Sequence, residues 1–110
     1  MLIHNTTFMI LREREEEFLE WFRAEFPLLE EASGGVNARL SVMRKAGGQY
    51  QIESEAQSVA FQMEFETMDA LEAWAAGPMA RVVERFEKRF GPEAMTFTSV
   101  FETVNPYQQS

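Results

Sequence analysis

Two consecutive strand–helix–strand patterns constrain the fold of this 110-residue chain more than any other feature. Each half has a β-favouring stretch, then apolar residues at helical spacing, then a second β-favouring stretch. The predicted strands are residues 2–11, 36–45, 58–66 and 94–104, with a polar hairpin loop at 46–55. Two βαβ units in one chain predict an α+β, ferredoxin-like βαββαβ sandwich, which is a four-stranded antiparallel sheet with both helices on one face.

Both helices are predicted to be interrupted at a proline. The first starts near Arg12 and continues past Phe22, and Pro27 leaves two readings of the residues up to Ser33, a kinked continuation or a separate short turn. The second has Thr67 as its N-cap. A break at Gly77-Pro78 and a restart with Pro78 at the first helical position are expected there.

The outer strands predict that the face of the sheet without helices is also partly buried. In residues 2–11, each face carries three apolar side chains, and residues 94–104 are divided in the same way. A sheet with one face in water alternates more cleanly, as residues 58–66 do. We therefore expect the second face to pack against another subunit.

Composition limits the class of partner and the number of domains. The net charge of −8 opposes binding to nucleic acid or to an anionic membrane. The chain has no cysteine, so a disulfide or a cysteine-ligated metal is ruled out, and no stretch resembles a membrane span. We expect one domain over residues 1–104, a polar tail over 105–110, and a cytoplasmic location.

Several short motifs carry a resemblance to a known family. They are Asn5 in the first strand, "FLEWF", "NARL", "FQMEFE" and "RFGPEAMTFTSVFE". Together they resemble an uncharacterised family of the dimeric α/β-barrel superfamily, the ferredoxin-like proteins related to antibiotic-biosynthesis monooxygenases. The resemblance implies a homodimer whose two sheets pack face to face as a barrel. For the nearest family it implies no known reaction.

One branch of that superfamily resembles haem-degrading monooxygenases. The branch has a first-strand Asn, a Trp on the second helix and a His ten residues later. Asn5 and Trp74 match the first two positions, but Glu84 occupies the third. Because a carboxylate is a poor substitute for the imidazole that ligates haem iron, we expect no haem cofactor. A cofactor-independent oxygenase that uses a pocket with Asn5 and Trp74 stays open.

The candidate site residues each have two readings. His4 is a general base if it lies in a pocket, and otherwise a structural or exposed histidine, which is the preferred reading because it lacks partners at a motif spacing. Asn5 and Thr7 either line a cavity or form hydrogen bonds at the dimer seam. Trp74 is assigned to the core, with a pocket wall as the alternative.

Charged residues give weaker candidates. Arg39, Gln62 and Glu64 are expected on the face away from the helices, where Arg39 and Glu64 form a cross-strand pair or contact a polar ligand. Glutamates 13, 15, 16, 17 and 20 lack the spacing of a metal motif and are assigned to a solvated helix face.

Three functions remain, and whether the protein is an enzyme is left undecided. The favoured one is a dimer that binds a small apolar or aromatic molecule. The others are an oxygenase or isomerase of the same architecture and a purely structural or regulatory dimer. A ligand-sized cavity between the sheet and the helices would distinguish the first two functions from the third. An interior filled by Phe18, Phe22, Phe61, Phe86 and Phe97 leaves no room for a ligand.

Overall fold

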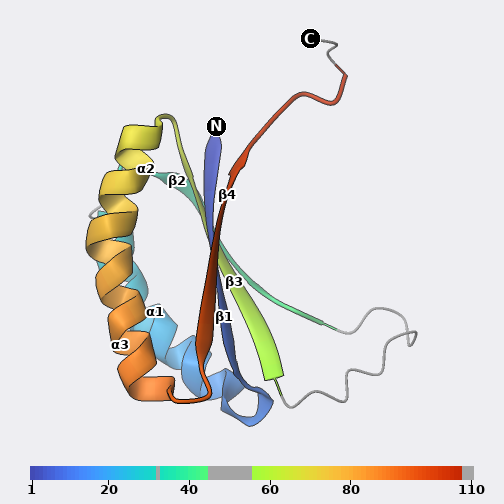
Figure 1. Ribbon diagram of the computed structural model, residues 1–110, viewed down its shortest axis with the longest axis vertical. Helices are drawn as coiled ribbons and strands as arrows, with labels where there is room; N and C mark the ends of the chain where they lie inside the picture. Colours follow the sequence, from blue (N-terminus) through green and yellow to red (C-terminus); the bar gives the residue numbers. More distant parts are fainter. Residues whose placement is uncertain (32, 45–55, 108–110) are drawn as a thin grey trace.

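The computed structural model describes residues 1–31, 33–44 and 56–107 (Figure 1). Its strands are β1 (Leu2–Leu11), β2 (Val36–Val42), β3 (Ala56–Phe65) and β4 (Met95–Glu102). Its helices are a short 3₁₀ turn (Arg12–Arg14), α1 (Glu15–Glu31), α2 (Met68–Trp74), a π-helical segment (Ala75–Met79) and α3 (Ala80–Phe90). The predicted hairpin loop at 46–55 lies outside the described residues.

The four strands form one antiparallel sheet in the order β2-β3-β1-β4. In Figure 1 the helices lie together on one side of this sheet. The order and the connections are those of the ferredoxin-like fold, so the predicted architecture is confirmed.

The first helix continues through Pro27, which decides between the two readings left open by the sequence. Glu15, Glu16 and Glu17 occupy the first turn of α1, where the helix dipole favours negative charge. Phe22 and Leu29 are buried on either side of the proline. Their packing holds both parts of α1 against the same core.

The second helix is interrupted around Gly77-Pro78 as predicted, but the interruption is a π-helical segment and not a break, and the α-helix restarts at Ala80 instead of Pro78. The N-cap is as expected, because Thr67 Oγ1 accepts a hydrogen bond of 3.1 Å from the Ala70 N–H. The chain then stays helical from Met68 to Phe90 by widening into a π-helical segment that contains Pro78. Since proline has no N–H to give to an α-helical bond, this wider turn accommodates it without ending the helix.

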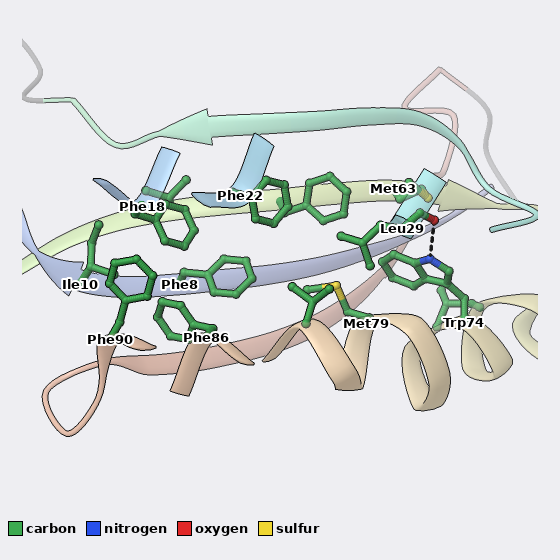
Figure 2. Packing of buried hydrophobic residues seen from close by; sticks show 14 of the residues in the cluster. Phe8, Ile10, Phe18, Phe22, Leu29, Met63, Trp74, Met79, Phe86 and Phe90 are labelled. Carbon is green, nitrogen blue, oxygen red and sulfur yellow. Dashed lines mark hydrogen bonds between the residues drawn. The ribbon is translucent and has the colours of Figure 1, made fainter. Parts of the chain in front are cut away.

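Aromatic rings fill the interior between the sheet and the helices. The centroids of Phe8 and Phe86 lie 4.9 Å apart, and those of Phe22 and Phe61 lie 5.0 Å apart. Figure 2 shows Phe8, Phe18 and Phe86 converging from strand and helices. Four of the five phenylalanines expected to fill the interior are therefore there, and they are Phe18, Phe22, Phe61 and Phe86. Phe97 is not, because it lies on the opposite face of the sheet and is 50% exposed.

No helix covers the other side of the sheet, which we call the open face. The pairing register assigns its residues: Ile3, Asn5, Thr7 and Met9 on β1, Ser58, Ala60, Gln62 and Glu64 on β3, Val36, Arg39 and Ser41 on β2, and Met95, Phe97, Ser99 and Phe101 on β4. Within the four strands this face carries only two charged side chains, Arg39 and Glu64. The face is thus poor in charge while the whole chain is 25% charged.

Candidate functional site

Strand β1 carries polar side chains on both of its faces. His4 and Thr6 are buried toward the helices, and Asn5 and Thr7 lie on the open face. The sequence left this facing undecided because each face of β1 has three apolar residues. The candidate residues therefore fall into an inner group and an outer group.

The inner group is built on His4 and Thr6, which we call the His4–Thr6 pair. His4 is 3% exposed and Thr6 is 1% exposed. Among the residues that the structure describes, neither His4 Nδ1 nor Thr6 Oγ1 finds a hydrogen-bond partner. Burial lowers the pKa of the His4 imidazole, so the ring is neutral at pH 7. Two unsatisfied polar groups in a core cost free energy, and they are the kind of groups that a bound molecule satisfies.

Trp74 contacts this pair from the end of α2. Its ring meets the His4 ring nearly at right angles, with centroids 5.1 Å apart and an interplanar angle of 82°. Trp74 is 2% exposed, which confirms its assignment to the core. The π-helical segment Ala75–Met79 begins at the next residue. Such segments occur often at functional sites, so Trp74 and the His4–Thr6 pair form the inner candidate site.

The indole of Trp74 also stabilises the end of the first helix. Its Nε1–H donates a hydrogen bond of 3.1 Å to the carbonyl oxygen of Leu29, drawn as a dashed line in Figure 2. Leu29 lies in the last turn of α1, where carbonyl groups lack partners within the helix. Trp74 therefore links α2 to the end of α1 while its ring also contacts His4.

The outer group does not meet Trp74. Asn5 Nδ2 donates a hydrogen bond of 3.1 Å to Thr7 Oγ1 on the open face. Because Trp74 packs against the helix side of the sheet, Asn5 and Trp74 lie on opposite faces. The expectation that these two residues line one pocket is wrong, and the reason is the alternation of side chains along β1.

The Arg39–Glu64 cross-strand pair is also not formed. The register sets Arg39 opposite Gln62 and Glu64 opposite Val36, with a bulge between Val36 and Arg39. Asn37, which has a φ of 55° in this bulge, donates to Glu64 Oε2 at 3.2 Å. Arg39 is exposed, and within the part of the chain that the structure describes no hydrogen bond or ion pair reaches it.

A shallow hollow lies on the open face near the edge at β2. Its volume is about 220 Å³, and it is lined by Thr7, Ser41, Val42, Met43, Ser58 and Ala60. The sequence analysis missed it. The small residues at alternate positions of residues 56–61 were the available signal, but their alignment with Ser41 depends on the register between strands.

Two of the glutamates at the start of α1, Glu15 and Glu17, form hydrogen bonds with other side chains. Hydrogen bonds from Arg44 and Gln57 lower the pKa of Glu15, and Arg14 lowers the pKa of Glu17. Over residues 1–31, 33–44 and 56–107, no three metal-ligating side chains gather in one place. In the same ranges, no helix combines the length and the apolar character that crossing a bilayer requires.

The residues present do not fit the haem site that the resemblance to haem-degrading monooxygenases suggested. Glu84, at the position of the expected iron ligand, is 65% exposed and pairs with Lys88 at 3.2 Å on the outer side of α3. His4, the only histidine, is buried beside Trp74 on a different element. Glu84 faces away from the interior. His4 lies between the sheet and the helices but is packed against the Trp74 ring, away from the position of the expected iron ligand.

Comparison with solved structures supports the fold. An antibiotic biosynthesis monooxygenase is similar, with a TM-score of 0.64, 17% identity, and coverage of 96% of this chain and 100% of that one. SnoaB, a cofactor-independent oxygenase from Streptomyces nogalater, gives a TM-score of 0.62, 12% identity and coverage of 98% of each chain. MhuD with manganese protoporphyrin IX bound gives 0.62, 19% identity, and coverage of 99% and 100%. At these identities the likeness shows a shared fold.

Sequence comparison assigns the family. No curated protein matches the chain in sequence. The model of the family DUF4286, described as a domain of unknown function, matches residues 1–104. The match covers every strand and helix described above. The chain therefore belongs to the DUF4286 family, within a fold that it shares with antibiotic biosynthesis monooxygenases.

Proposed function

We propose that the protein functions as a homodimer whose two sheets pack together through their open faces, and that this dimer binds a small apolar or aromatic molecule. The observation that carries the dimer is the apolar character of β4 on the open face. Met95, Phe97 and Phe101 are 54%, 50% and 51% exposed in the single chain. Large apolar side chains that share one face of a sheet are typical of an interface.

The charge distribution supports the same conclusion. The four strands place only Arg39 and Glu64 as charges on the open face, in a chain with a net charge of −8. Depletion of charge at the centre of a patch is a mark of protein interfaces. Two copies of an acidic protein approach most easily through the surface that carries the least charge.

Aspartate substitutions test the dimer. Phe97→Asp and Phe101→Asp each put a charge in the middle of the proposed interface, so both variants are expected to run as monomers in size-exclusion chromatography with light scattering. Leu28→Asp is the matched control, because Leu28 is 55% exposed on α1, away from the open face. If the two β4 variants keep the mass of the wild type, the open face is not the interface.

The ligand proposal has a separate basis in the His4–Thr6 pair. Phenylalanines fill the interior around this pair, so a ligand can enter only if side chains beside Trp74 move apart. A small aromatic molecule with a hydroxyl or carbonyl group would then pack against Trp74 and give His4 Nδ1 and Thr6 Oγ1 their missing partners. The similar solved structures include one described as a cofactor-independent oxygenase, which supports a small-molecule function for this fold. The proposal includes binding and no catalytic step, because Asn5 lies across the sheet from Trp74.

Fluorescence titration with 1-naphthol tests the ligand proposal. Trp21→Phe leaves Trp74 as the only tryptophan, so its emission reports on the inner site. We expect a saturable change in emission in this background. Adding Thr6→Val, which keeps the shape and removes the hydroxyl, should weaken binding about tenfold, as expected for the loss of one hydrogen bond to a buried group. No saturable change in the parent variant would instead leave a dimer with a structural or regulatory role.

A further inference from the structure

The open face is asymmetric across the sheet. At one edge, β4 contributes three large apolar side chains that are at least half exposed, and they are Met95, Phe97 and Phe101. Toward the opposite edge, Ser41, Ser58 and Ala60 line the hollow. One half of the face therefore projects while the other half recedes.

The strand order decides which two-fold axis would set the projecting edge of one copy over the receding edge of the other. In the order β2-β3-β1-β4, the projecting edge and the receding edge are equally far from the line between β3 and β1. A two-fold axis that runs parallel to the strands along that line, midway between the two sheets, exchanges the β4 edge of one copy with the β2 edge of the other. Sheets packed in the aligned way keep their strands within about 30° of each other, as this axis requires.

We propose that the homodimer uses this axis, so that Phe97 of each copy fills the hollow of the other. The inference rests on the proposed homodimer and adds how the copies fit. Phe97 lies in one cross-strand row with Thr7, Ala60 and Ser41. Because the axis does not move residues along the strands, the partner's Phe97 is placed over Ser41, at the hollow of about 220 Å³.

The next row gives the Arg39 side chain a polar partner, which it lacks among residues 1–31, 33–44 and 56–107. It consists of Ser99, Asn5, Gln62 and Arg39. The same axis places the partner's Ser99 over Arg39, and the partner's Asn5 over Gln62. Polar groups thus meet polar groups along the whole row, as a buried interface requires.

The row on the other side of Arg39 consists of Phe101, Ile3, Glu64 and Val36, and Val36 is 50% exposed. The axis places the partner's Phe101 over Val36, which matches apolar with apolar at the edges of the row. It places the partner's Ile3 over Glu64, whose carboxylate keeps the hydrogen bond of 3.2 Å that it accepts from Asn37. An axis perpendicular to the strands would instead set β4 over β4 and leave the two hollows facing each other, with no side chain to fill them.

Exchanging a large and a small side chain tests this arrangement. Ser41→Phe fills the hollow from its own side and Phe97→Ala leaves it empty, so each single change is expected to raise the dimer dissociation constant about thirtyfold. The double variant Ser41→Phe/Phe97→Ala restores one ring per hollow and should return to within about threefold of the wild type. Ser41→Phe/Phe101→Ala is the matched control, because Phe101 lies in another row and no recovery is expected.

Sedimentation equilibrium gives the dissociation constants, and far-UV circular dichroism checks that the variants fold. Both substituted positions lie on the open face, outside the helix-side core, so the monomer is expected to keep its fold. Recovery in the exchanged pair and not in the control pair supports the axis. A dimeric wild type whose singles bind normally, or whose two pairs behave alike, overturns the axis and leaves the homodimer standing. A monomeric wild type overturns both proposals.

Discussion

His4 and Trp74, seventy positions apart in the sequence, meet edge to face in the core with their ring centroids 5.1 Å apart. The contact joins β1 to the helical residue that precedes the π-helical segment. The imidazole is buried, and its Nδ1 has no hydrogen-bond partner in the described part of the chain. Several properties of the protein follow from this neighbourhood.

The stability of the protein should depend on the protonation of His4. Burial lowers the pKa of His4 in the folded state below the value of about 6.5 expected for the unfolded chain. Above pH 6.5 neither state binds the proton, and the stability is complete. As the pH falls from 6.5 through the folded-state pKa, the unfolded chain binds a proton that the folded chain excludes. The free energy of unfolding should then decrease by up to about 1.4 kcal/mol per pH unit.

Urea unfolding at several pH values checks this dependence. His4→Phe removes the titrating group, so its stability should stay level between pH 6.5 and 5, where carboxylates are still ionised. Because the chain has one histidine, its ring signals in an NMR titration give the folded-state pKa directly. A folded-state pKa above 6.5, or an equal pH slope in wild type and His4→Phe, contradicts the burial of a neutral imidazole.

Trp74→Phe should destabilise the fold more than Trp21→Phe. The first change removes the N–H that donates to the Leu29 carbonyl, which leaves a buried acceptor in the last turn of α1 without a partner. The loss of such a bond costs about 1–3 kcal/mol. Trp21→Phe is the control, because it removes the same atoms from a tryptophan that is only partly buried. Equal urea midpoints for the two variants would show that the Leu29 hydrogen bond contributes nothing.

Substitution by alanine at two glycines, Gly77 and Gly91, should change the stability of the protein in opposite directions. A Cβ at Gly91 would lie 2.6 Å from the Glu87 carbonyl oxygen, which accepts the Gly91 N–H that ends α3. Gly91→Ala should therefore destabilise the fold by about 1–3 kcal/mol. At Gly77, a Cβ meets no atom within 4 Å. Gly77→Ala should stabilise the helix by up to about 1 kcal/mol, and thermal unfolding of both variants measures the difference.

The sequence predicted the fold because its strongest signals are local. The alternation in residues 58–66 corresponds to β3, whose positions 57, 59, 61, 63 and 65 are buried. The Thr67 cap and the end of α3 before Gly91 were also local and were confirmed. Pro78 was misread because the sequence marks a helix-breaking residue but not the π-helical turn that absorbs it.

The candidate site was less predictable because it depends on facing and register. Both faces of β1 carry equal apolar content, so hydrophobicity could not place His4 inside and Asn5 outside. The Arg39–Glu64 pair was wrong because the register between β2 and β3 sets Gln62 opposite Arg39, and no local pattern in the sequence fixes that register. The meeting of His4 with Trp74 arises only when β1, β3 and the second helix pack together.

The native mass of the wild-type protein tests the central claim most directly. Multi-angle light scattering behind a size-exclusion column should give twice the chain mass of 12.7 kDa, unchanged on dilution into the low micromolar range. That mass is what the charge-poor open face and its exposed phenylalanines require. A single species of 12.7 kDa at every concentration would contradict the account.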